Sequence, residues 1–201
     1  MKTVLKAITA GIFLSFLISL VPFQAQCKQI SDDVFRLHIL ANSDSKEDQN
    51  LKLKVRDAVL QQTDNLYKNA DSKQDAISLT KQSLEKIIQT AQQTVYDNGY
   101  DYQVKAEITN MHFNTRHYES VTMPSGDYDA LRITIGSAKG KNWWCVMYPA
   151  LCIGAATNLD ELKANTTQEE YNILDSNGRY EYKFLILEYI QKIGEFFTFD
   201  K

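Results

Sequence analysis

The first stretch of the chain is strongly apolar and has a basic start. Lys2 and Lys6 precede an uncharged apolar run from Ala7 to Val21. A basic start followed by such a run is typical of a secretory signal, and the lysines favour an amino end that stays in the cytoplasm. We therefore expect residues 1–26 to be an export segment, with the rest of the chain outside the cytosol.

The sequence at the end of this segment leaves open whether the segment is cleaved. Pro22 is expected to end the helix, but Phe23-Gln24-Ala25 is a poor small-x-small cleavage site. The apolar run is also somewhat shorter than the roughly 20 residues of a transmembrane helix. Residues 1–26 are therefore either a cleaved signal peptide or an uncleaved membrane anchor. A lipid-bearing Cys27, which the bulky Gln26 disfavours, and a buried core helix are two further alternatives.

After a polar stretch, the pattern predicts a strand and then two helices. The strand covers residues 34–41, which are β-branched or apolar and are followed by polar residues. The first helix is capped by Asp44 or Ser45, and the second runs from about Asp71 or Ser72 to Asn98-Gly99. Apolar residues recur at helical spacing in both: Leu51, Val55, Ala58 and Val59, then Ala76, Leu79, Leu84, Ile87, Ile88, Ala91 and Val95.

The apolar period then changes from 3.6 to 2, which predicts strands. Apolar and polar residues alternate over 102–109, as in a half-buried strand. Further strands are predicted over 113–121, 130–135 and 142–148, with turns at residues 123–126 and 136–140. This order predicts an α+β, two-layer domain over residues 28–155. The helices are expected to cover one face of a mixed or antiparallel sheet, which combines the first strand with the three to four later strands.

Residues 156–201 form a C-terminal extension with a different pattern. Polar breakers occupy 165–167 and 175–178, and a helix is predicted from Tyr180 to Phe197. Its apolar stripe consists of Ile186, Ile190, Ile193 and Phe197. This helix either packs on the domain or reaches a partner.

Charge and cysteine content narrow the possible functions. The formal net charge is −3, and no run of lysine or arginine occurs, so a nucleic-acid partner is not expected. Three cysteines are too few for a disulfide scaffold. In an exported chain Cys145 and Cys152 are a candidate disulfide, with two thiols as the alternative. No cofactor motif is present in the sequence.

Two groups of residues are candidates for binding a partner. The first comprises Asn42, Asp44 and Asp48, near His38, where a strand turns into a helix; simple capping of the helix is the favoured interpretation. The second comprises Trp143, Trp144 and Tyr148. Because neighbouring residues on a strand face opposite sides, one tryptophan enters the core and the other faces the far side of the sheet. There it is either an anchor for a partner or buried under a second layer.

Cys145 with His112 or His117 is the candidate catalytic pair. A cysteine nucleophile needs a histidine base in contact, and the chain has no glycine-rich nucleophile turn. A buried, inert thiol is the favoured interpretation of Cys145. A zinc site from Cys145, Cys152 and a histidine lacks the usual ligand spacing.

Two long sequence blocks resemble the stage II sporulation protein R family. The first runs from Leu37 to Ser45 and continues through Glu47-Asp48-Gln49 to Val59. The second comprises residues 124–132, 140–146, 148–149 and 151–152. The resemblance covers residues 1 to about 155, and the remaining tail has no counterpart in it.

The resemblance implies a role in endospore formation. Proteins of this family are made in the forespore and exported to the space between two membranes. There they activate a membrane-embedded aspartic protease that cleaves the precursor of the mother-cell sigma factor, sigma E. The resemblance implies a signal rather than an enzyme. An uncleaved N-terminal segment would add a membrane surface as a further contact. The alternative is an exported cysteine-dependent hydrolase or thiol enzyme that acts at the cell envelope.

Overall fold

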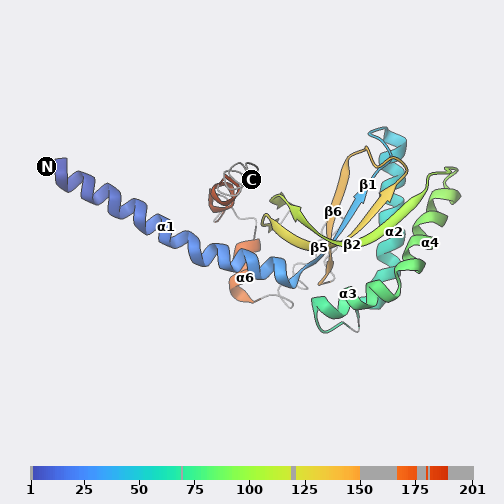
Figure 1. Ribbon diagram of the computed structural model, residues 1–201, viewed down its shortest axis with the longest axis horizontal. Helices are drawn as coiled ribbons and strands as arrows, with labels where there is room; N and C mark the ends of the chain where they lie inside the picture. Colours follow the sequence, from blue (N-terminus) through green and yellow to red (C-terminus); the bar gives the residue numbers. More distant parts are fainter. Residues whose placement is uncertain are drawn as a thin grey trace, which may run out of the picture.

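A long helix leads into a domain with one central sheet. The computed structural model describes residues 2–68, 70–118, 121–149, 167–175, 180 and 182–189. Helix α1 (Lys2–Asp33) extends away from the domain, and its carboxyl end runs directly into the first strand, as Figure 1 shows. Cys152 and residues 156–166 lie outside the described part of the chain.

The sheet is mixed and has four strands. The strand order is β2 (Val104–Phe113), β5 (Gly126–Ile135), β1 (Phe35–Leu40) and β6 (Asn142–Tyr148). Strand β5 pairs parallel to β1, whereas the β2–β5 and β1–β6 pairs are antiparallel. The α+β fold class is confirmed. The turn between β5 and β6 must pass around the end of β1, because β1 lies between those two strands.

Three helices cover one face of this sheet. They are α2 (Lys46–Tyr67), α3 (Lys73–Gln82) and α4 (Leu84–Asp97). Of the two predicted caps, Ser45 rather than Asp44 caps α2, accepting a hydrogen bond from the Asp48 amide at 3.1 Å. The core between helices and sheet includes the alternate, fully buried residues of β1 and β5: Phe35, Leu37, Ile39, Leu131, Ile133 and Ile135.

The single helix predicted over residues 71–98 is wrong in one respect, because it is broken into α3 and α4. The backbone amide of Ser83 donates hydrogen bonds to the carbonyls of Leu79 and Thr80, and α3 ends there before α4 begins. The break shifts the buried face of α3, so that Ile77 and Thr80 are buried while Leu79 is only half-buried. A one-residue break leaves the apolar spacing almost unchanged, so the pattern alone does not reveal it.

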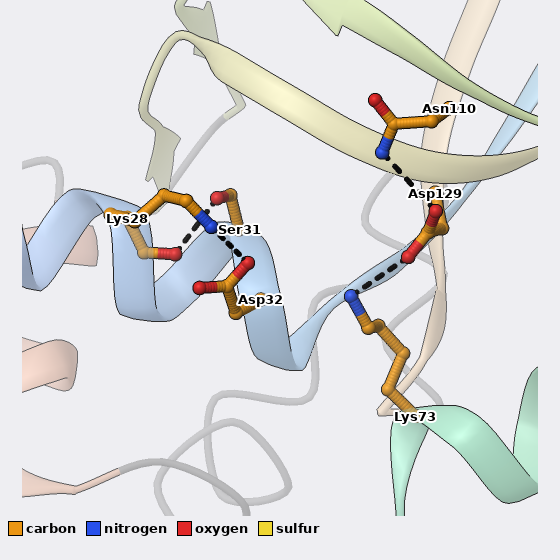
Figure 2. Close-up of polar contacts among 6 residues, drawn as sticks. All are labelled: Lys28, Ser31, Asp32, Lys73, Asn110 and Asp129. Atoms are coloured by element: carbon orange, nitrogen blue, oxygen red, sulfur yellow. Dashed lines mark hydrogen bonds and ion pairs between the residues drawn. The ribbon is translucent and has the colours of Figure 1, made fainter.

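A polar contact joins α3 to the sheet. Asp129 on β5 accepts hydrogen bonds from the Lys73 ammonium at 2.9 Å and from the Asn110 amide at 3.2 Å (Figure 2). Burial alone would raise the pKa of Asp129, but these two donors hold the pKa below its usual range. The contact fixes the start of α3 next to the junction of α1 and β1.

Among the described residues, those that cover the other face of the sheet gather at one end of it. The carboxyl half of α1, α6 (Gln168–Leu174) and the helical residues 182–189 gather there, on the opposite side of the sheet from α2 and α4 (Figure 1). They bury a second apolar cluster, whose members from α1 are Phe23, Cys27 and Ile30. The two ends of the chain thus contribute to one layer.

Two further predictions about segments are corrected. Pro22 does not end α1, which continues to Asp33; the packing of the helix on both sides of Pro22 offsets its missing hydrogen bond. Residues 113–121 do not form one strand. Strand β2 extends to Phe113, and a short pair follows it, β3 (Arg116–His117) with β4 (Thr122–Met123).

The C-terminal extension also differs from its predicted pattern. Helix α6 was not predicted, although Thr167 and Glu170 form a capping box at its start. In the later helix, Phe184 and Leu187 are buried, whereas Ile186 is only half-buried. The other predicted stripe residues, Ile190, Ile193 and Phe197, lie outside the described residues.

Candidate functional site

The first candidate group is a polar junction at the end of β1. Asn42 donates from Nδ2 to a carboxylate oxygen of Asp48 at 2.9 Å, and the Ser43 hydroxyl donates to the same oxygen at 2.5 Å. Asp48 is buried, which alone would raise its pKa, but the hydrogen bonds from Ser43, Asn42 and Tyr102 hold the pKa below its usual range. The side chains of Asn42 and Asp48 therefore have partners within the chain.

The same junction holds the β5–β6 turn where it passes around β1. Asn42 Oδ1 accepts a hydrogen bond from the Ser137 amide at 2.9 Å, and the Gly140 amide donates to the Ala41 carbonyl at 2.9 Å. Asp44 accepts from the Lys141 amide at 2.6 Å but remains exposed. Of the three residues predicted to bind a partner at this corner, Asp44 is the accessible one, and partner binding by all three stays a prediction.

Lys52 adds a buried cation under this turn. Its ammonium donates to the Lys141 carbonyl at 2.9 Å and to the side chain of Gln49 at 2.5 Å. Burial lowers the pKa of Lys52. Since these contacts tie α2 to the start of β6, the corner is built mainly to hold the crossing of the chain.

The two tryptophans lie on opposite faces of β6, as the alternation predicted. Trp143 packs against the helix-side core, with the Arg56 guanidinium 4.3 Å from its ring centroid. Trp144 lies on the other face, stacked on His38 with ring centroids 3.7 Å apart. Both are half-buried. Tyr148, half-buried on the helix side, donates from its hydroxyl to the Ala70 carbonyl at 3.4 Å.

A row of polar and aromatic side chains crosses the sheet at Trp144. Glu107, Arg132, His38 and Trp144 occupy directly opposite positions on β2, β5, β1 and β6. Opposite residues in a sheet project from the same face. Arg116, from β3, lies over the Trp144 ring at 5.4 Å. We call Arg36, His38, Arg116, Arg132 and Trp144 together the arginine face.

His38 in the arginine face is held neutral. Burial first, and then the charges of three arginines, lower its pKa to about 4, although the hydrogen bond with Asn142 acts in the opposite direction. The three are Arg132, Arg116 and Arg36. His38 Nε2 lies 3.1 Å from Asn142 Oδ1, so the neutral ring donates there. Its Nδ1 is buried and has no hydrogen-bond partner.

Arg36 is a fully buried guanidinium. It donates to the Tyr118 hydroxyl at 2.9 Å and lies over the rings of Phe113 and Tyr128 at 4.2 and 4.9 Å. Its Nε and Nη1 have no hydrogen-bond partner, and no described carboxylate forms an ion pair with it. The patterns used in the sequence analysis missed this residue, although an arginine inside an otherwise apolar strand is a visible signal.

The candidate catalytic pair receives no support from the structure. Cys145 has no exposed surface and lies in the helix-side core. His112 bonds to Asp127 at 3.0 Å and His117 to Thr122 at 3.1 Å. Within the described ranges, no group of three or more histidine, cysteine, aspartate or glutamate residues is placed to hold a metal ion. The Cys145–Cys152 disulfide stays a prediction, because Cys152 lies outside the described residues.

Sequence comparisons identify relatives over the part of the chain that forms the sheet. The protein-family model of stage II sporulation protein R matches residues 31–158. Stage II sporulation protein R of Bacillus subtilis (strain 168) is 35% identical over 140 residues, which span 70% of this chain and 62% of that protein. The chain therefore matches less than two thirds of the length of this relative. No solved structure shows significant similarity to the chain.

The matched region begins in the last turn of α1 and includes the polar junction, the arginine face and all four strands of the central sheet. It covers well over half of the chain. The protein therefore belongs to the stage II sporulation protein R family.

Proposed function

We propose that the protein is an exported sporulation signal that activates a membrane-embedded aspartic protease. That protease would cleave the precursor of sigma E in the mother cell, after the signal has passed from the forespore into the intermembrane space. Family membership supports the sporulation role. The protease, the export route and the activation step belong to this proposal.

The observation that carries the proposal is the exposed apolar part of α1. Val4, Ile12 and Ile18 are all more than half exposed to solvent. Among the described helices, α1 alone is long and apolar enough to cross a membrane, a property that it shares with N-terminal signal sequences. An exposed helix of this kind is compatible with export or anchoring, which a signal between two cells requires, and disfavours the buried core helix.

Activation of the protease would follow from preferential binding. A ligand shifts a conformational equilibrium only by the difference between its affinities for the two states. The protein would therefore bind the active arrangement of the protease more tightly than the inactive one. The accessible candidates for this contact are Asp44 and the outer face of β6 around Trp144.

Reconstitution tests this proposal directly. The full chain, inserted in vesicles, would be mixed with membranes that carry the protease and the sigma E precursor, and cleavage would be followed by gel electrophoresis. We expect cleavage only when the chain is present. Absence of cleavage with correctly folded partners would contradict the proposed function.

Three variants separate signalling from thiol chemistry in the same assay. Trp144→Ala and Asp44→Ala, each verified by circular dichroism to be folded, should lose most of the activation. Cys145→Ser should activate normally, because the thiol is buried and has no access to substrate. Loss of activation in a folded Cys145→Ser variant would instead favour a cysteine-dependent enzyme.

A further inference from the structure

We propose that the arginine face binds an extended acidic segment of a partner protein, with carboxylates bound by Arg116 and Arg132 beside the Trp144 ring. The identification of the partner as the protease rests on the proposed function; the chemistry of the surface does not.

The first argument is a local excess of positive charge, since three arginines lie here against the carboxylates of Glu107 and of Glu188, which accepts from the Thr115 amide at 2.8 Å. Arg36, Arg116 and Arg132 all act on His38, and no acidic group is among the causes that shift the pKa of this histidine. Among the described residues, the one ion pair at this surface is Arg132 with Glu107 at 3.2 Å, and both side chains are more than a third exposed. Exposed pairs of this kind are weak and exchange readily. The chain as a whole is acidic, with a net charge of −3, so this concentration of arginine is local.

The second argument is the set of unpartnered buried donors. Arg132 Nε is buried without a hydrogen-bond partner, as are two nitrogens of Arg36. Buried polar atoms normally have partners, because leaving them without one costs about 1–3 kcal/mol each. The guanidinium of Arg132 is thus oriented by the sheet but incompletely bonded. A carboxylate accepts two parallel hydrogen bonds from such a group.

The third argument is the position of the surface. Trp144 lies on β6, which among the described strands pairs with β1 alone and forms an edge of the sheet. Residues 145–147 of this strand are buried, so an extended segment would lie across the face of the sheet at Trp144 rather than pair with the edge. The half-buried Trp144 ring adds an aromatic platform, a residue type that often dominates binding energy. An extended acidic segment across this face would contact the ring and the half-buried Arg116 and Arg132 together.

A lipid surface fits this position less well. Strand β1 leads away from the end of α1, so the row through His38 lies farther along the sheet than the α1 junction at Phe35 (Figure 1). With α1 in a bilayer, the layer formed by the carboxyl half of α1, α6 and residues 182–189 lies between the membrane and this row. The occupant is therefore a protein segment rather than an anionic headgroup.

A simple probe tests this assignment without the protease. The full chain would be held in phosphatidylcholine nanodiscs, and fluorescein-labelled hexaglutamate would be titrated at low ionic strength with fluorescence anisotropy as the readout. We expect saturable binding of hexaglutamate and none of hexaglutamine. Arg116→Gln and Arg132→Gln should each weaken binding by about tenfold, as expected for loss of one charge-assisted contact.

Arg56→Gln is the matched control. Arg56 lies over the neighbouring Trp143 on the opposite face of β6, so this variant should bind hexaglutamate like the unaltered protein. Two outcomes would overturn the assignment. One is hexaglutamate binding that is absent or equally weakened by Arg56→Gln. The other is Arg116-dependent capture by phosphatidylglycerol vesicles without hexaglutamate binding, which would assign the surface to a membrane.

The same variants in the reconstituted cleavage assay separate this inference from the proposed function. If Arg116→Gln weakens hexaglutamate binding as expected but cleavage is unchanged, the surface is not the one that signals. If hexaglutamate binds as expected but the unaltered protein fails to activate cleavage, the assignment of this surface is supported and the proposed function is contradicted.

Discussion

His38 carries a large electrostatic penalty for protonation. Its ring is buried against Trp144 and surrounded by three arginine charges, which together lower its pKa to about 4. In the unfolded chain the same ring has its ordinary pKa of about 6.5. The folded and unfolded states therefore bind different numbers of protons between these two values, and stability depends on pH there.

We expect the free energy of unfolding to fall as the pH drops from about 6.5 to about 4. Above this window both states hold a neutral ring, and within it the unfolded state alone gains a proton. At about 1.4 kcal/mol per pKa unit, the loss is about 2–3 kcal/mol. Urea unfolding of the full chain in detergent, at a series of pH values, measures it. His38→Gln should remove this slope and the exposed His117→Gln should keep it; an unchanged slope in His38→Gln would contradict the argument.

Gly140 is the residue at which the chain crossing is tightest. A Cβ at this position would lie 2.1 Å from the Ser43 carbonyl oxygen and 2.9 Å from the Ala41 side chain. Backbone lies on both sides of the contact, so neither side can rotate away.

We therefore expect Gly140→Ala to destabilise the domain by about 2 kcal/mol or more, within the range of overpacking in a tight site. Gly126→Ala is the control, since a Cβ there meets its nearest atom at 3.7 Å, an ordinary contact. The midpoints of urea unfolding for the two variants give the comparison. Equal midpoints would mean that the turn moves freely.

At the scale of elements, the second layer depends on both ends of the chain. Phe23 of α1 stacks on Tyr180 at 5.6 Å and contacts Phe184 at 5.1 Å between ring centroids. The buried residues of α1 in this layer are spaced by three or four: Leu20, Phe23, Cys27 and Ile30. Although the second half of α1 follows an apolar run, it is thus a packed element of the domain.

Removing one aromatic ring from this layer should be costly. We expect Phe184→Ala to lower the free energy of unfolding by about 3 kcal/mol, as for other buried phenylalanines. Leu185→Ala is its neighbouring control, because Leu185 is 56% exposed and should change stability little. Thermal unfolding followed by circular dichroism compares the two. If the two substitutions had equal effects, the tail would not be part of the folded layer.

The elements that local patterns predicted are those whose packing follows one regular period. The alternation on β5 and β6 and the capping of α2 by Ser45 belong to this class. The break at Ser83 was not predicted, because apolar residues on both sides of it still recur at nearly helical spacing. The dual role of α1 was also hidden, since a uniformly apolar run masks the stripe that faces the sheet.

The candidate site was predictable only in part, for a similar reason. The opposite faces of Trp143 and Trp144 follow from strand geometry. The row from Glu107 through Arg132 and His38 to Trp144 does not, because it depends on the register of strands far apart in sequence. In particular, the parallel pairing of β1 with β5 places His38 beside Arg132, and no local pattern contains that pairing.

For the whole molecule, the packing of α1 bears on whether the protein diffuses or stays tethered. Cleavage after Ala25 would remove Phe23, which is 2% exposed, and would uncover Phe184 and Tyr180. Several apolar side chains before Leu20 are more than half exposed and are free to enter a bilayer: Val4, Leu5, Ile8, Ile12, Leu14 and Ile18. Both observations favour an intact chain, anchored by the first half of α1 and folded around the second.

We expect the protein isolated from sporulating cells to retain Phe23 and to fractionate with membranes, as intact-mass spectrometry and detergent extraction would show. Phe23→Ala gives the sharpest comparison, because it removes the packed ring and also converts Phe23-Gln24-Ala25 into a small-x-small site that signal peptidase accepts. That variant should be cleaved and released, whereas Phe23→Leu, which keeps a large apolar side chain, should stay intact and membrane-bound. A soluble, unaltered protein that begins at Gln26 would show instead that the signal diffuses, and that the second layer tolerates the loss of Phe23.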